Sequence, residues 1–194
     1  MADYKHGTYG VFTDSIGEVA AQSGTIAVYV GIAPVNLIRG FEKYVNTPVK
    51  ISNYEDVKRT MGYSANWDAF DLCEAFKLHF DNEAGNVGPI VAINVLNPAT
   101  HKKSAQTTAN LSFVNGRAVL KSDTIILDSL AIAESVEGVD YNLSYDFAKG
   151  QVVITSIGDA LTGTVAVTYS EVDTTAITET DVIGDVTDAG VYTG

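Results

Sequence analysis

The stretch Thr25-Ile26-Ala27-Val28-Tyr29-Val30-Gly31 is a nearly continuous apolar run that ends in glycine. Such a run is typical of a strand buried on both faces of a sheet, so we expect a central strand here. A second run of this kind is Pro89-Ile90-Val91-Ala92-Ile93-Asn94-Val95, and Pro48-Val49-Lys50-Ile51 predicts a shorter strand between the two. These three segments decide the fold of the first half of the chain.

Two helices are predicted between the second and third strands. Ser52 and Glu55 have the spacing of a capping box, and Gly62 follows as the residue that ends the helix. The next helix is expected from about Trp67 to Phe80, with one apolar stripe made of Ala69, Leu72, Cys73, Phe76 and Phe80. Strand, strand, helix, helix and strand together predict a small α/β layer with parallel pairing.

The pattern changes after Asn97-Pro98, where helical periodicity gives way to short alternating runs. Asn115-Gly116 and Ala148-Lys149-Gly150 are hairpin signals, and a short helical piece is possible near 129–133. The expected strands are Asn110–Val114, Arg117–Leu120, Thr124–Leu127, Val139–Tyr145, Gln151–Thr155 and Thr162–Tyr169. This region therefore predicts a small β-sandwich or barrel.

The N-terminal segment His6–Ser15 has strand chemistry but no partner of its own. A polar stretch, Glu18–Gly24, separates it from the first apolar run. Because an isolated strand is marginal in water, such a segment is either a disordered tail or a strand that completes the sheet of another molecule. The residues that we expect to make the inter-subunit contact are Thr8, Tyr9, Val11 and Phe12.

The fold class that follows is mixed α/β, a small α/β layer with an N-terminal extended arm and an inserted all-β domain. We predict an arm at 1–22, an α/β segment at 23–100 and an inserted β-domain at 101–177. We expect residues 178–194 to be the start of an incomplete return into the α/β domain, which predicts that the chain is truncated.

Composition excludes several function classes. The net charge is −12, and the only basic residue after Lys121 is Lys149, so there is no cationic cluster for nucleic acid or an anionic membrane. No apolar run is long enough to cross a membrane, and no signal peptide is present, so we expect a protein made in the cytoplasm. The single cysteine, Cys73, excludes an internal disulfide.

Candidate chemical groups are few, and each has a simpler structural explanation. Cys73 and His79 lie on opposite faces of one helix, because they are six residues apart, so they do not form a nucleophile and base. Gly31-Ile32-Ala33 lacks the later glycines of a dinucleotide-binding loop. His6 and His101 are expected in loops without a partner at metal-binding spacing.

Acidic clusters are the remaining candidates for a metal site. The loop containing Asp81, Asn82, Glu83 and Asn86 lacks the ordered ligand spacing of a calcium loop, and the same holds for Asp181, Asp185 and Asp188. We therefore predict no catalytic, metal or cofactor site, and no enzymatic activity.

An ordered set of segments gives the chain a resemblance to the N-terminal part of contractile tail sheath proteins of phages and phage-tail-like bacteriocin particles. The segments are Tyr9-Gly10-Val11, Gly24-Thr25-Ile26-Ala27-Val28, Val30-Gly31-Ile32-Ala33-Pro34, Asn46-Thr47-Pro48-Val49, Met61-Gly62, Val139-Asp140-Tyr141, Val152-Val153-Ile154, Val165-Ala166-Val167-Thr168-Tyr169-Ser170, Asp181-Val182-Ile183-Gly184 and Thr193-Gly194. We expect this chain to lack the C-terminal domain of that family, which packs on the tail tube.

The resemblance implies a structural subunit that stacks in rings around a tail tube and contracts to drive the tube through a cell envelope. It implies partners as well: neighbouring subunits joined by strand addition, and the tube. It also implies location in a virion tail or tail-like particle assembled in the bacterial cytoplasm, with the inserted β-domain on the outside. The alternatives are a surface- or carbohydrate-binding β module, which would use Tyr141, Tyr145 and Tyr169, and, less favoured, an α/β enzyme.

Overall fold

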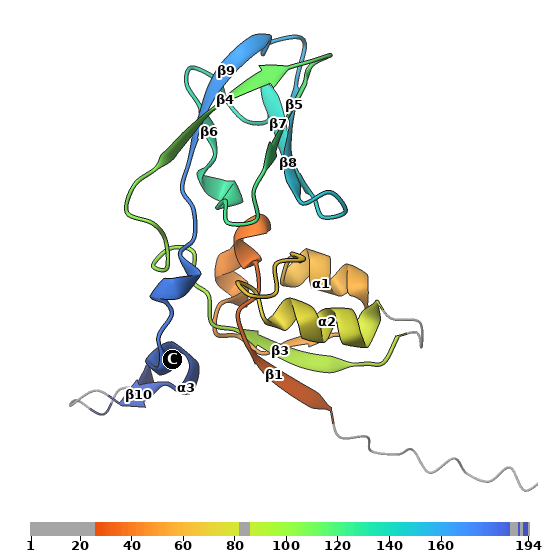
Figure 1. Ribbon diagram of the computed structural model, residues 1–194, viewed down its shortest axis with the longest axis vertical. Coiled ribbons are helices and arrows are strands. Elements are labelled where there is room, and N and C mark those ends of the chain that lie inside the picture. The colour runs from red at the N-terminus through yellow and green to blue at the C-terminus, as the bar shows by residue number, and fades with distance from the viewer. Residues whose placement is uncertain (1–25, 82–85, 187–189, 191, 194) are drawn as a thin grey trace, which may run out of the picture.

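The structure is a computed structural model that describes residues 26–81, 86–186, 190 and 192–193. The predicted arm, with Thr8, Tyr9, Val11 and Phe12, lies outside the described residues. The first half of the chain forms strands, two α-helices and two 3-10 helices (Figure 1). In chain order these are β1 (Ala27–Gly31), η1 (Val35–Leu37), η2 (Phe41–Tyr44), β2 (Val49–Ile51), α1 (Tyr54–Thr60), α2 (Leu72–Phe80) and β3 (Ile90–Asn94).

The first sheet has the strand order β1-β3-β2. β1 runs parallel to β3, which confirms the predicted parallel pairing, and β2 runs antiparallel to β3. The prediction of a central β1 buried on both faces is wrong, because β1 is an edge strand with Val28 59% and Val30 45% exposed. The physical reason is that α1 and α2 cover one face of the sheet, and no described element covers the other (Figure 1).

α1 is capped one residue later than predicted. Asn53 is the N-cap, and its side-chain oxygen accepts a hydrogen bond from the Asp56 N–H at 2.9 Å. Asp56 in turn accepts from the N–H of Ser52, the residue before the N-cap, at 3.2 Å, so the predicted capping box of Ser52 and Glu55 is wrong. Gly62 ends the helix as predicted, with φ of +71°.

α2 begins at Leu72 and not near Trp67, because the preceding residues form turns and Asp71 caps the helix. The side-chain oxygen of Asp71 accepts a hydrogen bond from the Leu72 N–H at 2.8 Å. Ala69 of the predicted apolar stripe lies before the helix. The other members of the stripe are in the helix and are all buried, which confirms them: Leu72, Cys73, Phe76 and Phe80.

The second half is rich in strands, as predicted. Two three-stranded antiparallel sheets, ordered β4-β9-β6 and β5-β8-β7, share one core in a sandwich-like arrangement. The predicted strand Thr124–Leu127 is wrong; only a bridge at Ile125 forms before a 3-10 turn. The elements are β4 (Thr107–Phe113), β5 (Arg117–Lys121), η3 (Leu127–Ser129), β6 (Ala131–Ile132), β7 (Tyr141–Asp146), β8 (Gln151–Ser156) and β9 (Gly163–Tyr169).

Both predicted hairpin turns form. Asn115 and Gly116 have φ of 51° and 70°, the backbone that a two-residue hairpin needs, and a bridge closes the turn between Val114 and Arg117. Beyond that bridge β4 pairs with β9 and β5 pairs with β8, so the turn carries the chain from one sheet to the other. The second turn joins β7 and β8 through 147–150.

The two halves exchange apolar side chains across their junction. Leu37, from η1, is buried in the core of the β-rich half. Ile126 and Val172, from the β-rich half, are buried in the core of the α/β layer, and Phe147 packs against both cores. The fold class is therefore confirmed, while the residue limits of the predicted domains stay a prediction.

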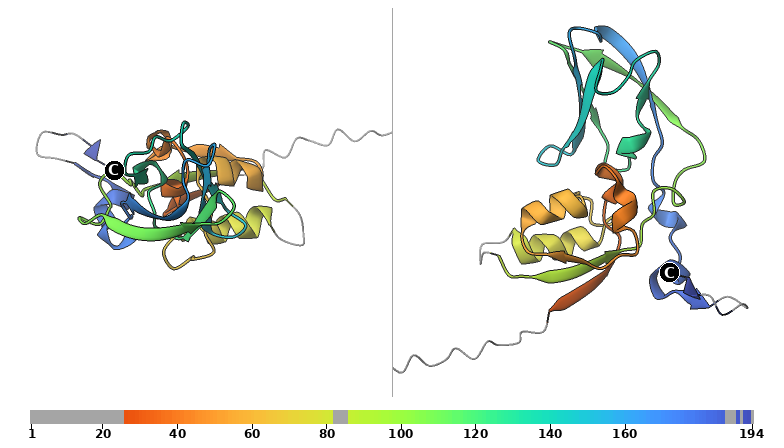
Figure 2. Two further views of the ribbon diagram at one scale, coloured as in Figure 1. Left: turned by 90° about the horizontal axis from the view of Figure 1, so that it is seen from above. Right: turned by 180° about the vertical axis from the view of Figure 1, so that it is seen from behind.

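The segments that lead into and out of the β-rich half lie side by side. The Lys103 N–H donates to the Glu171 carbonyl at 2.9 Å, and the Asp173 N–H donates to the His101 carbonyl at 3.0 Å. The chain then forms η4 (Thr174–Ala176), α3 (Glu179–Ile183), β10 (Asp185–Val186) and β11 (Tyr192–Thr193). Figure 2 shows α3 beside the α/β layer, on the side away from α1 and α2.

The turn after α1 gives a first prediction. A Cβ at Gly62 would lie 2.3 Å from the Pro34 carbonyl oxygen, in backbone that L-residues rarely adopt. We expect Gly62→Ala to lower the free energy of unfolding by about 2–4 kcal/mol, measured by urea denaturation. Gly138→Ala is the matched control, since its φ is +82° but its Cβ would meet nothing within 4 Å. A similar loss in both variants would contradict the steric explanation.

Candidate functional site

The free edge of β1 is the first feature of a candidate assembly surface. Within the described residues β1 pairs with β3 alone, so its other edge is open. An open edge presents unpaired N–H and C=O groups that can pair with a strand of another chain. The outward face of the same strand is apolar, with Val28 and Val30 about half exposed.

A shallow groove of about 270 Å³ lies between β1 and α2. His79 and Tyr29 form one wall, with the Tyr29 hydroxyl 2.8 Å from His79 Nε2. His79 Nδ1 lies 2.6 Å from the Val87 carbonyl oxygen, which can only accept, so Nδ1 carries the proton and Nε2 accepts from the tyrosine. Leu78 adds an apolar surface that is 63% exposed. The groove is thus lined by Tyr29 from β1 and by both apolar and acidic side chains beside it, Leu78, Asp71 and Glu74 among them.

The loop after β1 is held by the protein's own side chains. Asp71 accepts from the Ile32 N–H at 2.6 Å, and Asn94 Oδ1 accepts from the Ala33 N–H at 2.9 Å. A Cβ at Gly31 would lie 2.7 Å from an Asp71 carboxylate oxygen. The amide groups that a phosphate-binding loop would offer to a ligand are therefore engaged by internal partners.

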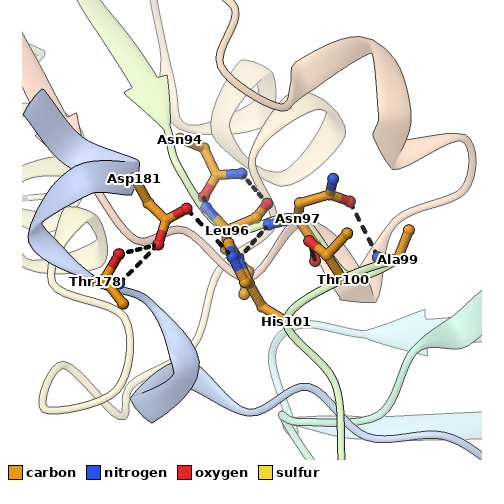
Figure 3. A network of polar contacts seen from close by, with 8 residues as sticks. All are labelled: Asn94, Leu96, Asn97, Ala99, Thr100, His101, Thr178 and Asp181. Carbon is orange, nitrogen blue, oxygen red and sulfur yellow. Dashed lines mark hydrogen bonds and ion pairs between the residues drawn. The ribbon is translucent and has the colours of Figure 1, made fainter. Parts of the chain in front are cut away.

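A polar network follows at the carboxyl end of β3 (Figure 3). Asn94 is fully buried and exchanges two hydrogen bonds with the Leu96 backbone, at 2.8 Å and 3.2 Å. The Asn97 N–H donates to His101 Nδ1 at 3.1 Å. This assigns the proton of the neutral ring to Nε2, which faces the Asp181 carboxylate at 3.6 Å.

Asp181 connects this network to α3. Its carboxylate accepts from the Thr178 N–H at 2.7 Å and from the Thr178 hydroxyl at 2.8 Å, which closes a capping box. Those hydrogen bonds, with a smaller contribution from His101, lower the pKa of Asp181. The sequence predicts no partner for His101 at metal-binding spacing, and the partner that His101 does have is this single carboxylate. Its partner lies far away in the sequence, so local spacing carried no signal for it.

A second polar junction links the two halves of the chain. The Asn36 side chain is fully buried and donates to the Asp123 and Ile125 carbonyls at 2.9 Å and 2.8 Å. The Ser64 hydroxyl donates to the Asp123 carboxylate at 2.9 Å. Glu171 accepts from Lys103, Thr107 and Thr124; burial opposes its ionisation, but these bonds outweigh it and lower its pKa.

The thiol and imidazole candidates are not brought together. Cys73 is fully buried, and burial raises the pKa of its thiol to about 12, so it stays protonated and poorly nucleophilic at neutral pH. Its sulfur accepts from the Ser64 N–H at 3.4 Å. His79 bonds instead to Tyr29 and Val87 on the other side of the helix.

The acidic residues considered for a metal site are not brought together either. Asp81 pairs with Lys77, and the Asn86 side chain donates to the Ser52 carbonyl at 2.8 Å. No group of three or more metal-ligating side chains exists within the described residues. In the same part of the chain, no helix is long and apolar enough to cross a membrane. His6, Asn82, Glu83 and Asp188 lie outside the described residues.

The tyrosines proposed for the carbohydrate alternative are mostly core residues. Tyr141 and Tyr169 are only 3% and 6% exposed and belong to the core of the β-rich half. Tyr145 is partly buried, and its hydroxyl donates to the Ser122 carbonyl at 3.1 Å. These side chains form no exposed aromatic platform on the β-rich half.

Comparison with known proteins identifies one informative relative. The chain is 29% identical, over 202 aligned positions, to the tail sheath protein of Burkholderia phage BcepMu. The match covers all of this chain and 39% of the relative, so the chain spans about two fifths of the curated protein that it matches. This confirms the resemblance to a phage tail sheath protein. No protein-family model matches the chain. No solved structure matches it either.

The network around α3 gives a second prediction. Asp181→Ala removes the cap and the His101 contact, so we expect faster amide hydrogen exchange in Thr178–Gly184 and unchanged exchange in β3. Because the folded pKa of Asp181 is lowered, its stabilisation is present above the ordinary carboxyl pKa of about 3.9 and is lost as pH falls through the folded value. The wild type should therefore show the same local change only in acid.

The matched control is Glu179→Gln, which removes a carboxylate from the same helix outside the network. We expect it to leave exchange in the helix unchanged. Equal exchange in the Asp181→Ala variant and the wild type at pH 6 would show that Asp181 does not hold α3.

Proposed function

We propose that this chain is part of a structural subunit of a phage tail sheath that assembles around a tail tube and contracts. The single observation that carries this proposal is the match, across the whole chain, to a tail sheath protein. A non-enzymatic role is consistent with the buried Cys73 thiol and with the separation of the titratable side chains described above. The location that follows is a virion tail or tail-like particle, assembled in the bacterial cytoplasm.

Subunits would be joined by strand addition between neighbours. We propose that Thr8, Tyr9, Val11 and Phe12 form the donated strand, because their side chains favour a pleated strand that has no partner in its own segment. The open edge of β1 and the groove beside α2 supply an acceptor. Each inter-subunit backbone hydrogen bond is worth about 0.5–1.5 kcal/mol, so one arm is a weak contact that a lattice multiplies.

The remaining parts have separate roles in this proposal. Contact with the tail tube would depend mainly on sequence beyond the matched part of the relative. The β-rich half, inserted between β3 and α3, would face outward from the particle. A carbohydrate-binding role is disfavoured, because Tyr141 and Tyr169 are buried.

A third prediction tests the function and the arm together. We expect the protein with its natural downstream sequence restored to form sheath-like tubes in electron micrographs. Val11→Pro should abolish or shorten these tubes, because proline cannot donate a backbone hydrogen bond to a strand pair. Val11→Thr is the matched control, since threonine keeps both the N–H group and the β-branched shape.

Two outcomes would contradict different parts of the proposal. Soluble monomers in all three proteins would remove the support for a sheath. Equal tubes in all three would leave the sheath standing but exclude strand addition through Val11.

A further inference from the structure

A cleft of about 680 Å³ separates the helical layer from the β7–β8 hairpin. One wall comes from α1 and α2 with the loop after α1; the other comes from the segment after β5 and the hairpin. Four of the lining side chains are aromatic: Tyr54, Tyr63, Tyr145 and Phe147. They form two edge-to-face pairs, one on each wall, with ring centroids 5.3 Å and 5.0 Å apart. The cleft thus offers aromatic surface from both halves of the chain.

The cations of this cleft are unusual in an acidic protein. Lys77, Lys121 and Lys149 line it, and Lys58 and Arg59 line the adjoining hollow. Five of the twelve basic residues are therefore gathered here, although the chain carries a net charge of −12. Three of these cations are already paired: Lys77 with Asp81, Lys58 with Glu55 and Arg59 with Asp56. Asp81 and Asp123 also line the cleft, but within the described residues Lys121 and Lys149 form no ion pair. The exposed ammonium groups of Lys121 and Lys149 can therefore pair with a carboxylate of another molecule.

A complementary element lies elsewhere on the same molecule. Glu179, Val182 and Ile183 occupy positions i, i+3 and i+4 of α3, so they share one face of that helix. Val182 is 46% and Ile183 is 80% exposed, and the Glu179 side chain is exposed beside them. From residue 150 onward the chain carries seven acidic and no basic residues. This element therefore pairs apolar surface with negative charge.

We propose that the cleft between α1, α2 and the β7–β8 hairpin binds the α3 face of a second copy of this chain. Val182 and Ile183 would pack on the tyrosine and phenylalanine rings, and Glu179 would meet Lys121 and Lys149. Charge complementarity favours this partner: an apolar ridge beside an exposed carboxylate, Glu179, matches an aromatic cleft in which Lys121 and Lys149 form no ion pair within the described residues. The contact is separate from strand addition and does not depend on it.

The geometry makes the contact intermolecular and directional. The helices α1 and α2 and the β7–β8 hairpin, which supply residues to the walls of the cleft, lie on the opposite side of the molecule from α3 in Figure 1 and Figure 2, so a chain cannot fill its own cleft. A contact between two different patches on identical copies is heterologous. Such contacts propagate head to tail and close into rings or extend into helical filaments. The same cleft and ridge would then recur at every step of an assembly.

The test is a charge exchange followed by sedimentation velocity over a range of protein concentrations. Lys121→Glu with Lys149→Glu reverses the charge of the cleft, and Glu179→Lys reverses the charge of the ridge. We expect the wild type to self-associate weakly, and each of the two variants to dissociate about tenfold more readily. An equimolar mixture of the two variants should associate again, because opposite charges are restored across the contact.

The matched control is Lys50→Glu with Arg117→Glu, which makes the same change in net charge at two exposed residues outside the cleft. We expect it to associate like the wild type. Circular dichroism of every variant checks that the fold is kept. Absence of association in the wild type, an equal loss in the control, or a mixture that stays monomeric would each overturn the proposal. None of these results bears on Val11, so failure here is distinguishable from failure of strand addition.

Discussion

The buried amide of Asn94 is the interaction on which the arrangement of the chain depends. It sits at the carboxyl end of β3, where its oxygen accepts from the Ala33 and Leu96 N–H groups and its nitrogen donates to the Leu96 carbonyl. A buried polar group left without such partners costs about 1–3 kcal/mol, so this geometry is strongly enforced. One side chain therefore fixes both the exit from β1 and the exit from β3.

Those two exits determine where the rest of the molecule can go. The exit from β1 leads into η1, whose Asn36 donates to the segment before η3 and whose Leu37 enters the core of the β-rich half. The exit from β3 leads to His101, which faces Asp181 and so places α3. Because apolar side chains also cross the junction in both directions, the two halves are joined by packing as well as by paired backbone segments.

The sequence predicted elements well where local chemistry decides them. The runs around β1 and β3, the turn at Asn115-Gly116 and the glycine after α1 each carry a signal within a few residues. Prediction from the sequence failed where the structure depends on contacts between residues far apart in the chain. An apolar run such as Ile26–Val30 suits burial on both faces, but whether a second layer covers it depends on elements elsewhere. The pairing of His101 with Asp181 and the gathering of Lys121 and Lys149 beside Tyr63 also depend on folding at long range. The arm residues lie outside the described structure, so that site stays a prediction.

An assembly built from this chain would rest on contacts that are weak singly. A short added strand contributes a few hydrogen bonds, and a two-lysine cleft gains little from exposed charge, since surface pairs are worth about 0–1 kcal/mol. Such contacts suit subunits that must change neighbours without unfolding, because each can break while others hold. The stability of the assembly then comes from effective concentration. Once a copy is held by one contact, its further contacts form within the same particle and are strongly favoured. A chain that associates only weakly by itself is therefore what a lattice-forming subunit requires.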